Sequence, residues 1–327
     1  MNNFIDHISI QNFKSMERCE ISECKRINLF IGRPNVGKSN IIEALSLLTI
    51  PYLKENTSKK LTNLIRLENE TELFYNGNWE RETFIDTQSF HCDIQFHPQE
   101  NLRIFIHKDG QRYGAKVDEK LNVSALSTKV DFTTNVKKYL YKHDITYKKG
   151  HSKYLVPPFG FNLLSIIDNF ADLKNDVLTF FADYGLEVAF DKSSQTIKVI
   201  ERNKDGIFLI PYNSVADTLQ RIIFYKAAIK SNKNSVLLFE EPEAHSFPPY
   251  MSHLTQEMIS SKSNQFFVAT HSPFILNDLL ENAKDELAVF NVDYKNKQTL
   301  VRPLTQSELH EVFQYGVDLF TNNESYL

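Results

Sequence analysis

Hydrophobic and polar residues alternate near the N-terminus, as they do in β-strands with one buried face. The pattern predicts short strands at Ile8–Phe13, Cys19–Ile21 and Ile27–Ile31. From Lys38 to Leu48 the apolar residues instead recur with a helical period, and we expect Pro51 to stop that helix. The predicted order is therefore strand, glycine-containing loop, helix.

The C-terminal third alternates helices with strands that are apolar on both faces. The predicted elements are helices at Asn213–Ala228, Tyr250–Ser260 and from about Phe274, and strands at Ser235–Phe239 and Gln265–Thr270. Such strands are typical of parallel sheets that helices cover on both sides. We therefore predict an α/β fold in which both ends of the chain build one sheet.

The middle of the chain lacks a sharp motif. Its local signals are strands around Ile94 and Ile104, a hairpin turn at Lys108–Gly110 and a helix from Leu163 to Tyr184. We predict a discontinuous core of residues 1–54 and 211–327, with an inserted mixed α+β lobe at 55–210. Heptads do not persist, which argues against a long coiled-coil arm.

Composition narrows the possible environments of the protein. The 327 residues are 42% hydrophobic and 24% charged, and the net charge of −4 argues against a surface that coats nucleic acid or anionic lipid throughout. Three cysteines cannot form a disulfide framework, which favours a reducing compartment. We find no signal peptide or membrane span, and we expect a cytoplasmic protein without a membrane partner.

The strongest motif follows the third predicted strand and fits the phosphate-binding pattern G-x-x-x-x-G-K-S. Backbone N–H groups of such a loop bind one anion, Lys38 neutralises the β- and γ-phosphates, and the Ser39 hydroxyl ligates Mg²⁺. We predict a nucleoside triphosphate site at Gly32, Arg33, Pro34, Asn35, Val36, Gly37, Lys38 and Ser39.

Small GTPases share the wording PNVGKS, but they also need D-x-x-G and N-K-x-D. No Asp has Gly at the third following position, and in Asn203-Lys204-Asp205 the Asp stands one place too early. GTP specificity therefore has no support.

A second signal is the apolar strand that ends in Glu240 and Glu241. Neighbouring side chains at a strand end point to different sides, so one carboxylate can support the metal while the other polarises the attacking water. We assign Glu240 to the metal and Glu241 to the water. Alone, the pattern would also fit an acidic turn that ends a buried strand and keeps it soluble.

A third signal is His271, at the end of the apolar strand Gln265–Thr270. Its imidazole could donate a hydrogen bond to the γ-phosphate or to the attacking water. A single histidine at a strand end is more often structural, but the order of the three motifs favours the catalytic interpretation for Lys38, Glu241 and His271.

Taken together, the motifs resemble the ABC-type ATPase heads of the RecF, SMC and OLD (overcoming lysogenization defect) class. The residues that carry the resemblance are Gly32–Ser39, Glu240–His245 and Thr270–Pro273, with Ile10–Ser15 and Asn40–Leu45 in support. It implies that Asn40 also contacts the nucleotide. It further implies that ATP with Mg²⁺ is hydrolysed, and that ATP is sandwiched between protomers of a dimer or higher oligomer.

The chain departs from the family pattern at two places. Glu240 stands where the family has Asp. The signature segment that should contact the partner protomer's γ-phosphate lacks its usual glycine, and Ser214, Asp217 and Gln220 are the candidate residues there. The alternative is a simple amphipathic helix start, capped by Asn213 or Ser214.

Partners are expected from the resemblance and from one basic segment. The part after His271 has no acidic cluster for a Toprim nuclease, so we expect a separately encoded effector, a nuclease or a toxin. A further segment could contact nucleic acid or be a solvated lysine face. It contains Lys137, Lys138, Lys142, Lys148, Lys149 and Lys153, interleaved with Tyr139, Tyr141, Tyr147 and Tyr154.

These expectations combine into one functional hypothesis and one alternative. The first is an ATPase that oligomerises with nucleotide and regulates an effector in phage defence or DNA repair. The alternative is a catalytically slow ATP-binding scaffold that sequesters a toxin without acting on nucleic acid.

Overall fold

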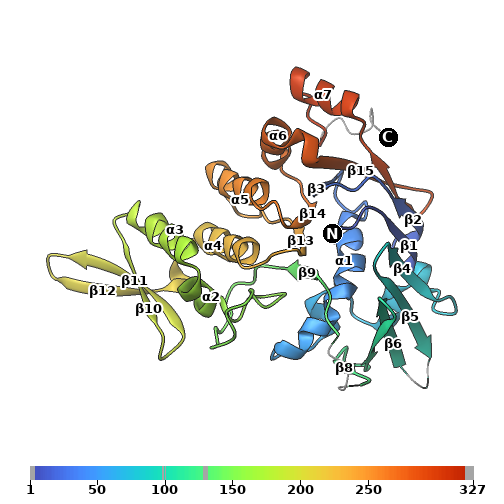
Figure 1. Ribbon diagram of the computed structural model, residues 1–327, viewed down its shortest axis with the longest axis horizontal. Coiled ribbons are helices and arrows are strands. Elements are labelled where there is room, and N and C mark those ends of the chain that lie inside the picture. Colours follow the sequence, from blue (N-terminus) through green and yellow to red (C-terminus); the bar gives the residue numbers. More distant parts are fainter. Residues whose placement is uncertain (1–3, 98, 100, 128–131, 321–327) are drawn as a thin grey trace. The chain divides into compact units, whose positions relative to one another are not determined.

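The computed structural model describes residues 4–97, 99, 101–127 and 132–320, and these form two compact units (Figure 1). Unit 1 comprises the described residues of Met1–Lys138, Asn234–Glu241 and Lys262–Leu327. Unit 2 comprises those of Tyr139–Lys233 and Pro242–Ser261.

A six-stranded sheet in unit 1 joins the two ends of the chain. Its order is β16 (Gln298–Pro303), β15 (Leu287–Lys295), β3 (Ile27–Ile31), β14 (Gln265–Ala269), β13 (Val236–Glu240) and β9 (Val136–Tyr139). The strands β15, β3, β14 and β13 run parallel, and all five residues of β3 are buried. The prediction of one parallel sheet built from both ends is confirmed.

The other sheet of unit 1 is antiparallel and has seven strands. Its order is β2 (Met16–Ile21), β1 (Ile8–Phe13), β4 (Thr83–Thr87), β5 (His91–His97), β6 (Asn101–Lys108), β7 (Gln111–Val117) and β8 (Val123–Ala125). The predicted N-terminal antiparallel portion is confirmed. It extends far beyond residue 54, because β4 pairs with β1, so the compact units do not follow the boundaries predicted at 54 and 210.

Helix α1 (Lys38–Ser46) contacts β13 and β14 of one sheet and β1 of the other. Its apolar residues join the core of unit 1, which includes Phe30, Phe267 and Phe290. Pro51 does not end α1 as predicted, because the 3₁₀ helix η1 (Leu47–Glu55) takes over at Leu47 and contains the proline. The other helical elements of unit 1 are η2 (Leu61–Asn63), η3 (Glu70–Leu73), η4 (Tyr75–Gly77), α6 (Pro273–Asn282), η6 (Lys284–Glu286) and α7 (Gln306–Tyr315).

Unit 2 consists of helices beside a three-stranded antiparallel sheet (Figure 1). The elements are α2 (Leu163–Asn169), α3 (Ala171–Ala182), β10 (Glu187–Asp191), β11 (Thr196–Asn203), β12 (Gly206–Pro211), η5 (Tyr212–Ser214), α4 (Asp217–Lys230) and α5 (Pro248–Ser260). The other three helices pack against α4.

Two helix boundaries in unit 2 correct the sequence analysis. The helix predicted from Leu163 to Tyr184 is two helices, because Phe170 leaves the helical conformation between them. Helix α4 begins at Asp217 after the short helix η5, and its N-cap is Ala216 without a side-chain cap. The predicted capping by Asn213 or Ser214 is therefore wrong.

Candidate nucleotide-binding site

The phosphate-binding loop runs from the end of β3 to the start of α1, as its motif predicts. Gly32 (φ 144°) and Gly37 (φ 103°) lie in the backbone region that favours glycine. A Cβ at Gly32 would overlap the Val292 carbonyl oxygen, and one at Gly37 would overlap Thr299 Oγ1. Both glycines are therefore required by close contacts as well as by backbone conformation.

Lys38 is the first residue of α1 and is 5% exposed. Its Nζ donates to the carbonyl oxygens of Gly32 (2.8 Å) and Arg33 (2.7 Å), so the ammonium lies over the loop. No side chain caps α1, and its first turn contains no acidic residue. The N–H groups of that turn and the ammonium group together provide an anion-binding environment.

Side chains from distant segments hold the loop in place. Thr299 Oγ1 on β16 donates to the Val36 carbonyl oxygen (2.8 Å) and lies 2.6 Å from Ser15 Oγ. Asn40 Nδ2, a predicted nucleotide ligand, donates to the same Ser15 Oγ at 2.6 Å. No sequence pattern points to Thr299, because its role depends on the pairing of β16 in the folded chain.

Glu240 ends β13 with a side chain that is 10% exposed, and each of its carboxylate oxygens has a cationic partner. Arg66 Nη2 donates to Oε1 (2.6 Å) and Lys138 Nζ to Oε2 (3.3 Å), while the nearby Ser39 hydroxyl also favours the charged form of the carboxyl group. Burial raises the pKa of Glu240, but the two cations and the hydrogen bonds outweigh burial, and the pKa is lowered. The carboxylate is therefore ionised.

Ser39 and Glu240 fit the metal that the sequence analysis assigns to them. A hydroxyl and a nearby carboxylate are hard oxygen ligands, the type that Mg²⁺ prefers. Mg²⁺ keeps several waters and takes further ligands from substrate phosphates, so two protein oxygens at the edge of a phosphate-binding loop suit this ion.

Glu241 differs from its neighbour in exposure and in partner. Its side chain is 50% exposed, its backbone is left-handed (φ 43°), and Oε1 lies 3.6 Å from His271 Nε2. Burial and the nearby Lys38 lower the pKa of His271, and Glu241 opposes them. The imidazole is therefore neutral near pH 7, and one of its nitrogens can accept a hydrogen bond.

The predicted residues of three distant segments meet in one cleft of about 370 Å³ in unit 1. Its lining residues are Pro34, Asn35, Gly37, Lys38, Ser39, Asn40, Arg66, Glu241 and His271. Val36 is also in the loop, but its side chain is buried in the core. The structure thus brings the phosphate-binding loop, Glu241 and His271 to one place.

A buried ion-pair network that no sequence motif indicates lies behind the cleft. Glu43 of α1 is fully buried and accepts hydrogen bonds from the Lys14 ammonium and from Arg66 Nε (3.0 Å). Arg66 connects this network to Glu240. Glu43 is the one charged residue in the mostly apolar stretch 41–53 and could have been noticed for that reason, whereas Arg66 has no local pattern.

The candidate signature residues lie in unit 2, and their surroundings differ. Ser214 is exposed, and Asp217 accepts a hydrogen bond from Arg221 Nε at 2.6 Å. Gln220 is 2% exposed, donates to the Val215 carbonyl oxygen (2.8 Å) and accepts from the Tyr141 hydroxyl (3.1 Å). The amide of Gln220 therefore serves the packing of unit 2.

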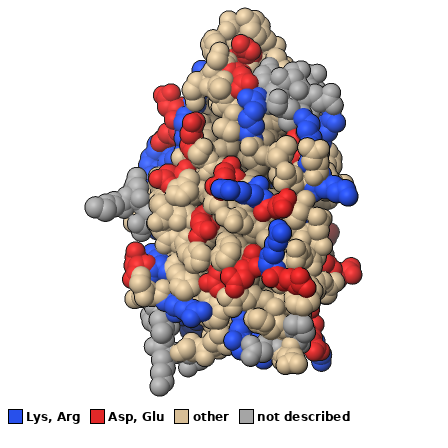
Figure 2. Space-filling view, turned by 90° about the vertical axis from the view of Figure 1, so that its right-hand side faces the viewer, with Lys and Arg blue, Asp and Glu red and all other residues tan. Residues whose placement is uncertain are grey.

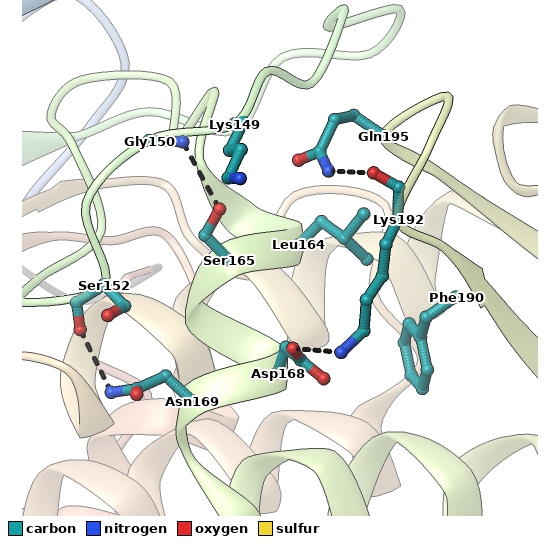
Figure 3. A pocket seen from close by; sticks show the side chains of 10 residues that line it. All are labelled: Lys149, Gly150, Ser152, Leu164, Ser165, Asp168, Asn169, Phe190, Lys192 and Gln195. Atoms are coloured by element: carbon teal, nitrogen blue, oxygen red, sulfur yellow. Dashed lines mark hydrogen bonds and ion pairs between the residues drawn. The ribbon is translucent and has the colours of Figure 1, made fainter.

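The basic segment is not the continuous surface that its sequence indicates. Lys137, Lys138 and Tyr139 are buried, and the exposed lysines of the segment are Lys142, Lys148, Lys149 and Lys153. Lys149 lines a polar hollow of about 360 Å³ in unit 2, where Lys192 is paired with Asp168 at 2.7 Å (Figure 3). Figure 2 draws a different face, the one on the right-hand side of Figure 1 where the antiparallel sheet of unit 1 lies, and cationic and anionic side chains are intermixed there.

Two expectations about the environment of the chain can be compared with the structure. In the part of the chain that the structure describes, the helices are too short or too polar to cross a membrane. The cysteines Cys19, Cys24 and Cys92 are free thiols.

Comparison with known proteins agrees with the resemblance read from the motifs. Residues 27–277 match the family described as "AAA domain, putative AbiEii toxin, Type IV TA system". Short stretches are similar to the DNA replication and repair protein RecF. The identity is 28% over 57 residues with the Lactobacillus acidophilus protein and 34% over 67 residues with that of Leptospira interrogans. These matches are short on both sides. They cover 17% and 20% of this chain and 15% and 18% of the respective RecF proteins.

Solved SMC head domains share the fold. A head bound to the C-winged helix domain of ScpA is 16% identical, with a TM-score of 0.50 and coverage of 92% of this chain and 98% of that one. A Pyrococcus furiosus head with an extended coiled coil, bound to the C-terminal domain of ScpA, is 13% identical, with a TM-score of 0.52 and coverage of 95% and 99%. Since the family match spans most of the sequence and the fold agrees, the chain belongs to this family of ABC-type ATPase domains.

Proposed function

We propose that the protein is a Mg²⁺-dependent ATPase that converts ATP and water to ADP and phosphate. The observation that carries this proposal is the single cleft in which Lys38 and Ser39 face Glu241 and His271, with the ionised Glu240 carboxylate near Ser39. Binding and hydrolysis both need residues that the chain supplies within this one cleft.

Phosphate binding follows from the loop. The Lys38 ammonium, which donates to two loop carbonyls, can turn its N–H groups to the β- and γ-phosphate oxygens, and the uncapped start of α1 adds backbone donors. Ser39 and Glu240 would hold Mg²⁺, which neutralises phosphate charge when it is bound.

Water activation is assigned to Glu241. Its half-exposed carboxylate faces the cleft and can accept a proton from a water that binds beside it and the His271 imidazole, whose Nε2 lies 3.6 Å from Oε1. His271 orients that water, because its neutral ring offers one donor and one acceptor.

The wider role rests on similarity. The ABC-type heads that the motifs resemble sandwich ATP between protomers, so we propose a nucleotide-dependent dimer or higher oligomer in which Ser214 and Asp217 are the remaining signature candidates. We further propose that the protein regulates a toxin or nuclease effector in phage defence or DNA repair, in the cytoplasm. The name of the matched family, which mentions a toxin, supports the toxin part, and the name of the RecF relatives supports the repair part. Contact with nucleic acid is part of this proposal.

A second candidate is the slow scaffold that sequesters an effector. Two observations favour it: Arg66 and Lys138 hold the carboxylate of Glu240, and Gln220 of the signature segment is bonded inside unit 2. In this case ATP would bind and change the oligomeric state with little turnover.

Phosphate release by the full chain separates the two candidates. We expect Mg²⁺-dependent release that Lys38→Ala removes and Glu241→Gln reduces by about 10²-fold or more, the usual contribution of a general base. The same measurement with added duplex or single-stranded DNA tests whether nucleic acid stimulates phosphate release. Tight ATP binding without release would favour the scaffold, and release unchanged by Glu241→Gln would exclude the role given to Glu241.

A further inference from the structure

Lys138 is a buried cation that no motif explains. It lies on β9, next to β13 in the six-stranded sheet, and its side chain is 3% exposed. Its Nζ donates to the Leu64 carbonyl oxygen (2.7 Å) and to Glu240 Oε2 (3.3 Å). Burying an ammonium group is costly unless it is paired, so this placement needs a compensating interaction, which Glu240 supplies.

The two cations at Glu240 differ in burial. The Arg66 side chain is 68% exposed, although its Nε also bonds Glu43, whereas Lys138 is enclosed and bonded to a backbone carbonyl. A divalent ion that approaches Ser39 and Glu240 therefore meets a fixed positive charge at short range. Charges interact more strongly in a protein interior than in water, so the repulsion is substantial.

We propose that Lys138 is a resident cation that keeps divalent metal ions away from Glu240 until the phosphates of a nucleotide bring them. This inference rests on the proposed nucleotide site. Without nucleotide, the carboxylate is already neutralised by Lys138 and Arg66. With nucleotide, the negative charge of the phosphates outweighs Lys138, so metal enters together with the nucleotide and the loading order is fixed.

The chain offers a matched control on the same strand. Lys137 is also buried, but successive strand residues point to opposite faces, and its Nζ lies 3.5 Å from Ser235 Oγ and 5.5 Å from the centre of the Tyr52 ring. Lys137→Gln removes a buried charge of the same kind away from Glu240, so it reports the general effect of such a loss.

The test measures Mn²⁺ binding to the full-length, nucleotide-free protein by the loss of the free-ion signal in electron paramagnetic resonance. We expect Lys138→Gln, which keeps a donor for Leu64, to bind Mn²⁺ at least about tenfold more tightly than wild type. Lys138→Arg and Lys137→Gln should bind like wild type. Adding Glu240→Gln to Lys138→Gln should remove the gain.

Equal Mn²⁺ affinity in wild type and Lys138→Gln would overturn the inference, and so would an equal gain in Lys137→Gln. Thermal unfolding of each variant shows whether it folds, and Lys138→Met replaces Lys138→Gln if the latter does not. Binding of a fluorescent ATP analogue with Mg²⁺ is measured on the same samples. If wild type does not bind the ATP analogue, the proposed function is contradicted. The Mn²⁺ comparison tests only the role that we propose for Lys138.

Discussion

At the scale of single residues, the glycines of the phosphate-binding loop have a steric requirement that the motif does not express. A Cβ added to Gly37 would overlap Thr299 Oγ1 and would lie only 2.9 Å from Ser15 Oγ. The loop is therefore fitted against β16 and the β1–β2 turn. A substitution there changes contacts on strands far away in sequence.

Gly37→Ala should lower the free energy of unfolding by about 1–3 kcal/mol from the left-handed backbone, and more from the clash with Thr299. It should also abolish ATP binding, because the loop must move. Gly110→Ala is the control, since Gly110 has φ 75° but nothing within 4 Å of a Cβ. Urea unfolding and ATP titration check both variants, and similar losses in the two would refute the contact argument.

Protonation of His271 should determine how the rate of ATP hydrolysis falls at acidic pH. Burial and Lys38 lower its pKa below the ordinary value of about 6.5, so the ring stays neutral as pH falls from 8 to 6.5 and becomes protonated only at lower pH. We expect turnover to fall on acidification with a midpoint below pH 6.5, and this limb to be absent in His271→Asn. A wild-type midpoint above pH 7 would contradict the assignment.

At the scale of elements, β16 supports the loop although it is not part of any nucleotide motif. Thr299 is fully buried and joins Val36 to Ser15 through one hydroxyl group. The strand is held antiparallel to β15, so the position of the loop depends on the C-terminal hairpin.

Thr299→Val keeps the shape of the side chain but leaves the Val36 carbonyl oxygen without this donor, at a cost of about 1–3 kcal/mol. If about 1.4 kcal/mol of that loss falls on the loop, ATP binds about tenfold more weakly. Thr196→Val, which breaks an exposed hydroxyl pair with Ser194 in unit 2, serves as the control. Calorimetry measures the ATP affinity of both variants. An unchanged affinity in Thr299→Val would show that other contacts hold the loop.

The elements that sequence alone predicted well are those with a strong local period. The parallel strands were recognised because they are apolar on both faces, and Lys38, Glu241 and His271 were found because motifs end such strands. The extension of the antiparallel sheet by β4–β8 and the start of α4 depend on long-range pairing. Arg66 and Thr299 were missed for the same reason, since each is a single residue without a local pattern. Lys138 was recognised only as part of the basic segment, because its pairing with Glu240 depends on the folded chain.

At the scale of the whole molecule, the proposed ATP sandwich makes association depend on nucleotide. Wild type should shift to a larger species in sedimentation velocity with ATP and Mg²⁺, and Lys38→Ala should not, because it lacks the phosphate cation. Glu241→Gln should keep the larger species for longer, since bound ATP persists when hydrolysis is slow. A single species in all three proteins, with and without ATP, would contradict nucleotide-driven association.

The central strand β3 has a consequence for synthesis of the protein. Asn28 on this strand bonds the backbone of Phe266, 238 residues later, and the other neighbour of β3 is β15. A ribosome therefore releases the phosphate-binding loop long before the strands that flank it exist. A nascent chain that lacks those strands cannot form the cleft, so any activity that ATP controls begins only after translation has passed β15.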